Sequence, residues 1–176
     1  NLSSMTFMVA MGLSVAATIR VGNQKGFKAF GELKRITLSI FLLTLLLDVF
    51  FAGFFVAFNE WLPWLYLDSA TGLDTFAVAE LAGSLLFIAA FFQIFDGAQV
   101  VALGSLRGLQ DVRIPTWITF FSYGLIGVQV KLYLSIKADM GARGVWIGLC
   151  LGLVVSSLLL YLRFRYLSNK LIRANG

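Results

Sequence analysis

The stretch that decides the fold is FAVAELAGSLLFIAAFFQIFDGAQVVALGSL, residues 76–106. It is almost wholly apolar and longer than the about 20 residues that an α-helix needs to cross a bilayer. The chain around it has 176 residues, of which 59% are hydrophobic and 13% charged. Soluble domains carry about 25% charged residues, and a soluble fold of this size could not cover its surface with so few. The sequence therefore predicts an all-α membrane protein.

Four further apolar segments bring the predicted transmembrane helices to five, at about 3–19, 36–58, 76–106, 114–135 and 144–164. The runs are continuous and do not alternate polar with apolar residues, which favours helices over the strands of a membrane barrel. Nothing divides the chain, so we treat residues 1–176 as a single transmembrane region. The odd helix count and the start at Asn1 lead us to expect partner helices outside this sequence.

Charge separates the connections into two groups. Most of the fourteen Lys and Arg fall in three segments, 20–35, 107–113 and 163–176, which include Arg20, Arg107 and Arg113. The segment 59–75 between them contains acids and neither Lys nor Arg. Because cytoplasmic loops carry the excess of basic residues, the three basic segments are predicted to be cytoplasmic, together with the C-terminus. Basic residues at the ends of apolar runs are typical of charges that set the topology of a protein in membrane lipid, and they argue against a nucleic-acid partner.

Several kinds of chemistry are excluded by residue content. The chain has no His and a single Cys, Cys150, which lies in an apolar run. His- or Cys-based metal sites and Ser-His or Cys-His nucleophile pairs are therefore excluded. There is also no dense cluster of acids, so we expect no enzyme activity and no cofactor other than a coupling ion.

The sharpest functional candidate is Asp96, a carboxylate in the middle of the third predicted helix. A charge at bilayer depth costs about 2.5–3.5 kcal/mol on insertion scales, so such residues face a cavity or a partner. Gln93 and Gln99 lie three residues to either side, and the three polar groups form one slanted stripe on a helix. A carboxylate flanked by amides suits a dehydrated monovalent cation or a proton. The alternative is a hydrogen-bonded clip between helices, and for Asp48, which has Thr44 one turn earlier, both interpretations stay open.

Three passages resemble one transporter family. They are GLSVAATIRVGNQKG (12–26), QIFDGAQVVALGSLRGLQDVRIPTWITFFSYGLIG (93–127) and GARGVWIGLCLGLVVSSLLLYLRFR (141–165). Together they resemble the MATE-family multidrug and toxin extrusion transporters, which are built of two six-helix lobes. The resemblance implies that this chain supplies five helices of the C-terminal lobe of a twelve-helix, multi-pass protein of the inner (plasma) membrane. The remaining helices of the same transporter would then be its partners.

The resemblance also implies an activity. Members exchange amphipathic, often cationic, compounds for Na⁺ or H⁺ by alternating access between the lobes. Asp96 matches the acid that many members use in the cation site of this lobe, and it would be a Na⁺ ligand in a sodium-coupled member. Candidate substrate contacts are Phe92, Phe95 and Tyr123. The sequence departs from the family pattern at Gln129 and Lys131.

Two other functions are kept as alternatives. A lipid-linked oligosaccharide flippase of the wider superfamily is expected to need a more cationic lumen for a diphosphate headgroup. Here one Lys, Lys131, lies at such a depth, which disfavours this function. The second alternative is that the protein is a structural membrane subunit. In that case we expect the substitution Asp96→Asn to have no effect on transport.

Overall fold

The computed structural model describes residues 2–62, 73–137 and 141–175, and most of the acidic segment 59–75 lies outside these ranges. Every regular element in the described ranges is helical. The long helices are α1 (Leu2–Gly26), α2 (Phe30–Ala57), α3 (Leu73–Gly108) and α6 (Gly141–Asn175). Between α3 and α6 runs a helix with wide turns, made of α4 (Arg113–Phe121), η2 (Ser122–Gly127), α5 (Val128–Leu132) and η3 (Tyr133–Lys137).

The prediction of an all-α membrane protein is confirmed. Four of the described helices are long and apolar enough to cross a membrane, at Ser3–Gly26, Phe30–Ala57, Ala82–Gly108 and Gly144–Ala174. Their outer faces remain apolar. On α2, for example, large side chains are left uncovered by the rest of the chain: Leu38, Leu42, Leu46, Val49 and Phe50. Such surface is stable in lipid or against other helices and costly in water.

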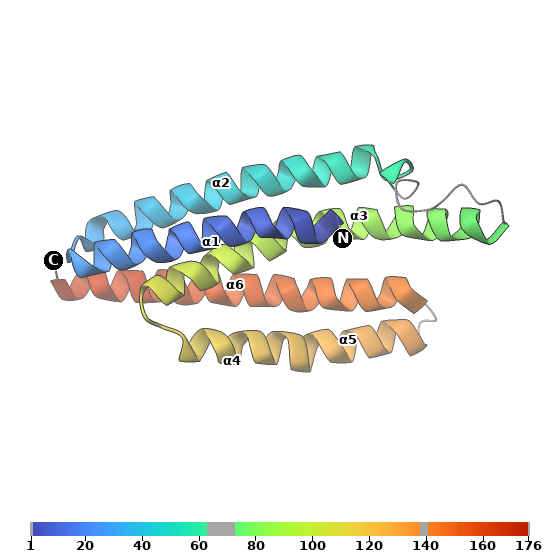
Figure 1. The fold of residues 1–176 in the computed structure, drawn as a ribbon. Coiled ribbons are helices and arrows are strands. Elements are labelled where there is room, and N and C mark those ends of the chain that lie inside the picture. The colour runs from blue at the N-terminus through green and yellow to red at the C-terminus, as the bar shows by residue number, and fades with distance from the viewer. Residues whose placement is uncertain (1, 63–72, 138–140, 176) are drawn as a thin grey trace.

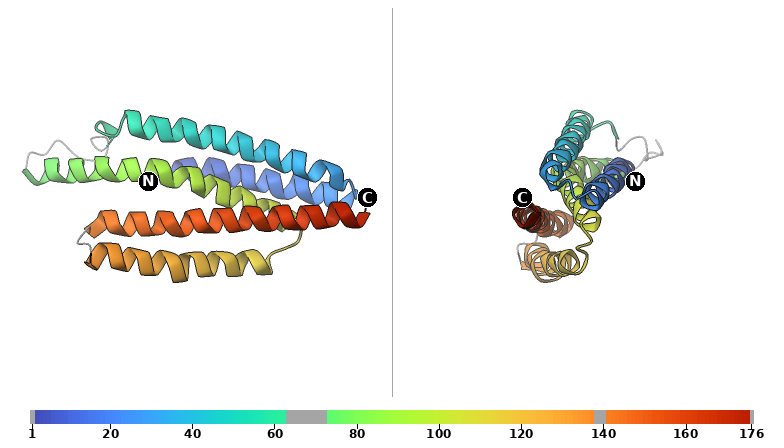
Figure 2. Two further views of the ribbon diagram at one scale, coloured as in Figure 1. Left: turned by 180° about the vertical axis from the view of Figure 1, so that it is seen from behind. Right: turned by 90° about the vertical axis from the view of Figure 1, so that its left-hand side faces the viewer.

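The helices lie side by side in two groups (Figure 1). α3 packs against α1, α2 and α6, and α1 also packs against α2. The α4–η3 helix packs mainly against α6, on the side of α6 away from α1 and α2, as the end-on view shows (Figure 2). α3 therefore occupies the middle of the bundle, which places its polar residues between other helices.

The fourth predicted span differs from a regular α-helix. It has π-helical turns at η2 and η3, and at the end of η2 the backbone N–H of Val128 bonds to the carbonyl of Tyr123, five residues back. The backbone of this helix also lies against glycines of α6. A Cβ atom on Gly148 would lie 2.5 Å from the backbone nitrogen of Lys131. The unusual Lys131 is thus accommodated with its backbone toward α6 and its side chain half-exposed.

The basic connections are shorter than the sequence suggests. Helix α1 continues past Arg20 to Gly26 and α2 begins at Phe30, so the expected loop 20–35 reduces to a tight turn. The turn residue is Lys28, with φ of 56°. The backbone N–H of Ala29 bonds to the carbonyl of Gln24, the bond between residues five apart that typifies a Schellman helix end.

α3 ends in the same way. Gln110 has φ of 63°, and the backbone N–H of Asp111 bonds to the carbonyl of Leu106. Neither left-handed position is a glycine, although glycines lie nearby in both segments. The glycines serve another purpose, because Gly104 and Gly108 of α3 lie directly against the backbone of α1 at Ser14 and Thr18. Small residues that allow two backbones to approach are typical of membrane helix pairs.

The close α1–α3 contact is joined by side-chain hydrogen bonds. Ser14 Oγ donates to the carbonyl of Val100 over 2.7 Å, and Thr18 Oγ1 donates to the carbonyl of Gly104 over 2.9 Å. An apolar cluster then fills the space where α1, α2, α3 and α6 meet toward the basic end: Val21, Leu33, Ala102, Leu106, Leu109, Leu160 and Phe164. This packing fixes α3 relative to α1 and α2, and so positions the polar residues that lie further along α3.

Candidate functional site

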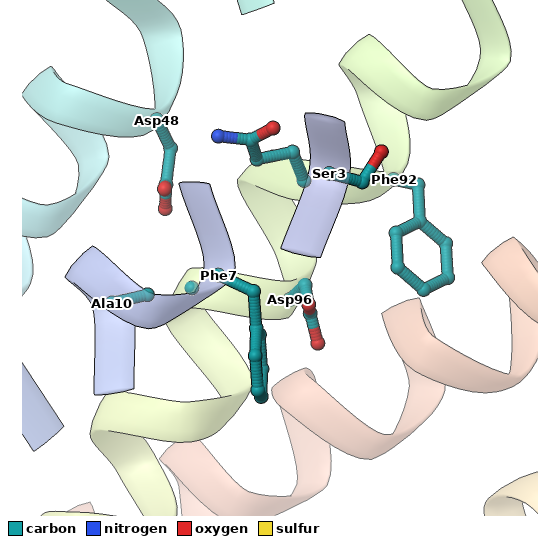
Figure 3. A pocket seen from close by; sticks show the side chains of 8 residues that line it. Ser3, Phe7, Ala10, Asp48, Phe92 and Asp96 are labelled. Atoms are coloured by element: carbon teal, nitrogen blue, oxygen red, sulfur yellow. The ribbon is translucent and has the colours of Figure 1, made fainter. Parts of the chain in front are cut away.

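Two acids from different helices line one small cavity. Asp48 comes from α2 and Asp96 from α3, and the α1 residues Ser3, Phe7 and Ala10 line the same space (Figure 3). The cavity measures about 10 Å³, close to the smallest space that holds one water molecule. Asp96 is half-buried and lines this cavity, so that a role as a cavity acid stays a prediction.

Asp48 is the more deeply buried of the two acids, with 3% of its surface exposed. Its carboxylate fills the space left by the missing side chain of Gly97, so that a Cβ atom at that position would collide with it. Among the described residues, Asp48 Oδ2 has no hydrogen-bond partner. Asp48 also lies close enough to Asp96 for the two charges to act on each other.

Gln93 belongs to the same cavity and is held by α1. Thr6 Oγ1 donates a hydrogen bond to Gln93 Oε1 over 2.8 Å. Gln93 is 5% exposed, and its Nε2 atom has no partner among the described residues. Thr6 was not among the sequence candidates. The signal that points to it is Ser3 and Thr6, three residues apart on one helix face in an otherwise apolar run.

Gln99 lies apart from this cavity. Tyr123 of η2 donates its hydroxyl hydrogen to Gln99 Oε1 over 2.7 Å. The physical reason is the helical period of 3.6 residues. Each step of three residues along the stripe turns back by about 60°, so Gln93 and Gln99 point about 120° apart and meet different neighbours. The structure thus brings Asp96, Gln93 and Asp48 together and joins Gln99 to Tyr123 instead.

The aromatic candidates differ in their surroundings. Phe92 lines the cavity, and its ring packs edge-on against Trp146 of α6 at 5.8 Å between centroids. Phe95 is half-buried. The neighbouring Phe91 is 53% exposed and packs against Phe87 of the same helix, which fits contact with lipid.

The basic candidates Arg20, Arg107 and Arg113 are exposed near helix ends. Two basic residues outside that set hold the α3–α4 turn. Lys25 Nζ donates to the carbonyl of Leu109 and to Gln110 Oε1, each over 2.9 Å. Arg163 Nε donates to Asp111 Oδ2 over 2.8 Å. Sequence spacing does not reveal these pairs, because their members are more than fifty residues apart along the chain.

The donor set fits a small monovalent cation. Within residues 2–62, 73–137 and 141–175, no three Asp, Glu, His or Cys side chains come together. Divalent ions such as Ca²⁺ take six to eight oxygen ligands in proteins. Two carboxylates and a carboxamide in a space of water size are instead suited to a proton or a partly dehydrated monovalent cation.

Comparison with known proteins gives consistent matches. The family model described as MatE matches residues 1–132. A protein named "Probable multidrug resistance protein NorM" from Xanthomonas axonopodis pv. citri is 36% identical over 97% of this chain and 36% of its own length. The same-named protein of Agrobacterium fabrum is 37% identical over 93% of this chain and 35% of its own. "Multidrug resistance protein MdtK" of Yersinia pestis is 37% identical over 97% of this chain and 37% of its own length.

Among solved structures, the crystal structure of the eukaryotic MATE transporter AtDTX14 superposes with a TM-score of 0.84. It is 19% identical in sequence, and the match covers 99% of this chain and 39% of that chain. At this identity the match establishes the fold alone. The chain spans little more than a third of the length of the curated relatives it matches.

Proposed function

Since the chain belongs to the MatE family, we propose that it forms part of the C-terminal lobe of a cation-coupled antiporter. The transporter exports amphipathic, often cationic, compounds in exchange for Na⁺ or H⁺. The observation that carries this proposal is the position of Asp96, which lies within the apolar stretch Ala82–Gly108 of α3 and lines a cavity together with a second acid. This chain matches only 36% of the length of a relative, which supports a larger transporter. Its other helices would complete this lobe and form the second lobe.

Coupling follows from the cost of charge at this depth. An ionised carboxylate inside the bilayer is costly unless a cation neutralises it. Asp96 therefore binds a proton or Na⁺ and releases it when a cationic substrate takes its place. For transport, ion and substrate must bind the inward- and outward-facing states with different affinities, because a ligand that binds both equally shifts no equilibrium.

The substrate surface is aromatic. Phe92, at the cavity, and Phe95, one residue before Asp96, provide flat apolar faces. Tyr123 adds a third ring beside Gln99. Cations attract aromatic faces by about 0.5–2 kcal/mol per contact, depending on desolvation. A flat organic cation is thus matched in shape by the rings and in charge by Asp96.

Orientation in the membrane follows from the basic ends. The C-terminus and the α1–α2 turn lie at the same end of the bundle (Figure 1), and both are rich in Lys and Arg. The positive-inside rule then assigns this end to the cytoplasm of an inner (plasma) membrane protein.

The test uses everted membrane vesicles that contain the full-length transporter carrying this sequence. Ethidium, a flat monovalent cation, is followed by fluorescence under an imposed Na⁺ gradient and, separately, under a pH gradient. We expect Asp96→Asn to reduce uptake to the level of vesicles without the transporter. The control Glu32→Gln removes an exposed acid in the first turn of α2 and is expected to transport normally.

The two gradients identify the coupling ion, because only the coupled ion drives uptake. Transport by Asp96→Asn at the wild-type rate under both gradients would contradict the proposal and make Asp96 a structural residue. Equal membrane levels of the variants, measured by immunoblot, ensure that a loss reflects transport and not insertion.

A further inference from the structure

We propose that Asp48 of α2 is a second carboxylate of the coupling site, which together with Asp96 binds one monovalent cation, Na⁺ or H⁺, in the cavity between α1, α2 and α3. This inference rests on the function proposed above, which assigns coupling to Asp96. It adds a residue from another helix and makes the site bridge α2 and α3.

The first argument is the burial of Asp48 with one carboxylate oxygen, Oδ2, left unpaired. Its side chain is 3% exposed, and Oδ2 is unpaired within the described part of the chain. Buried polar atoms without a partner are rare and costly, because desolvation is then not compensated. A carboxylate that served as a permanent clip between helices would have a donor on the neighbouring helix. An unpaired oxygen beside a cavity is instead available for a cation.

The second argument is the way α3 receives this carboxylate. Gly97 provides the space, since any side chain at that position would occupy the place of the Asp48 carboxylate. Gly97 directly follows Asp96, so Asp48 meets α3 at the residue next to Asp96, about 100° away around the helix. In Figure 3, Asp48 extends from α2 toward α3, and Asp96 lies beside Phe7 of α1. The cavity that they share, about 10 Å³, admits one small occupant.

The third argument is the amide of Gln93. Its Oε1 atom is fixed by Thr6, and an amide oxygen has a second lone pair available to a cation. Its Nε2 atom is buried without a partner in the described residues, and it is a donor. The amide therefore provides an acceptor while the cation is bound, and a donor for a carboxylate that has lost its cation.

The fourth argument is the charge around the pair. The membrane-depth parts of the three helices packed on α2 contain no Lys, Arg or His: residues 2–19 of α1, 82–106 of α3 and 144–162 of α6. The titratable groups they do contain are Asp96 of α3, with Cys150 and Tyr161 of α6. Tyr123 of η2, bonded to Gln99, lies near Asp96. Two like charges without a basic neighbour cannot both stay ionised cheaply, so the pair retains a cation.

The experiment measures cation binding by the full-length transporter in detergent, without substrate. Equilibrium binding of ²²Na⁺ is one arm, and proton uptake during acidification in Na⁺-free solution is the other. The variants are Asp48→Asn, Asp96→Asn and the control Glu32→Gln. We expect each of the first two to weaken Na⁺ binding at least about tenfold, a change equivalent to about 1.4 kcal/mol. If the wild type binds no Na⁺, each should instead take up about one proton fewer than the wild type.

The outcomes separate the two proposals. If Asp96→Asn loses cation binding while Asp48→Asn binds the cation as the wild type does, the role of Asp48 is overturned and the proposed function stays in place. Wild-type binding by both variants overturns both. The control Glu32→Gln is expected to bind the cation as the wild type does, so that a loss in either of the other variants reflects the removed cavity acid.

A second readout covers the case in which Asp48→Asn alters folding. Infrared difference spectra between acidic and alkaline Na⁺-free buffer follow the carbonyl stretch of protonated carboxyl groups. In the wild type we expect contributions from both acids, and Gly97→Ala, which keeps both acids but displaces the Asp48 carboxylate, should shift the Asp48 component. A spectrum of Gly97→Ala identical to that of the wild type would contradict the placement of Asp48 in the shared cavity.

Discussion

Replacing Gly104 by Ala tests the contact that holds α3 against α1. A Cβ atom at this position would collide with the carbonyl oxygen of Ser14, and it would lie 2.5 Å from Ser14 Oγ and 3.0 Å from the Ser14 carbonyl carbon. Two of these three atoms are backbone, so a rotation of a side chain cannot relieve the clash. Helix α1 must move away, and the hydrogen bonds from Ser14 to Val100 and from Thr18 to Gly104 stretch with it.

The expected cost follows from three contributions. Overpacking a well-filled interface costs about 1–3 kcal/mol. The two interhelical hydrogen bonds are worth about 0.6 kcal/mol each in membrane proteins, which adds about one more if both are lost. Ala is a better helix residue than Gly by about 0.8–1.0 kcal/mol, which offsets the last amount. The net destabilisation is therefore about 1–3 kcal/mol, or roughly 2–12 °C in melting temperature at 2–4 °C per kcal/mol for a unit of this size.

The assay is thermal unfolding of the full-length transporter in detergent, followed by size-exclusion chromatography with fluorescence detection. Two matched substitutions on α1 provide the controls. At Gly22 the nearest atom to a new Cβ is 3.6 Å away, an ordinary contact, and at Gly12 nothing lies within 4 Å. Gly22→Ala and Gly12→Ala should melt at or slightly above the wild-type temperature. If Gly104→Ala melts as high as these two, the close α1–α3 contact is refuted.

Three more substitutions test the basic end and the α5–α6 contact. Arg163→Ala leaves the half-buried Asp111 without its partner and should lower stability by about 1–3 kcal/mol; a melting temperature equal to that of the wild type would argue against the pair. Lys25→Met removes a donor to the α3–α4 turn and should cost about 0.5–1.5 kcal/mol in the same melting assay. Gly148→Ala places a methyl group against the backbone of Lys131 and should lower stability by about 1–3 kcal/mol; a neutral effect would show that this helix packs more loosely on α6.

The sequence was sufficient for the class of fold, and it singled out Asp96 as a candidate. Continuous apolar runs of about 20 residues indicate membrane-spanning helices, since the required length is set by the thickness of the bilayer. Asp96 stands out for the same reason, because an acid in such a run requires a cavity or a partner. For Asp48 the sequence left open whether it is a cavity acid or a clip between helices, because its surroundings depend on the packing of α2 on Gly97.

Other features depend on contacts that local patterns do not encode. The polar stripe on α3 is real, but its two ends face different helices, so Gln99 bonds to Tyr123 and Gln93 to Thr6. The left-handed turn residues after α1 and α3 are Lys28 and Gln110, and not one of the nearby glycines. The π turns of η2 and η3 leave hydropathy unchanged, so a hydropathy pattern cannot distinguish them from α-helix.

The central claim is that the carboxylate at position 96 exchanges a small cation for the transported compound. The most direct measurement is the release of pre-bound ²²Na⁺, or of protons in Na⁺-free solution, when ethidium is added to the purified full-length transporter. The wild type should release the ion in proportion to the ethidium bound, and Asp96→Asn should release none. Ion release by Asp96→Asn equal to that of the wild type, or ethidium binding by the wild type with its ion still in place, would contradict the account.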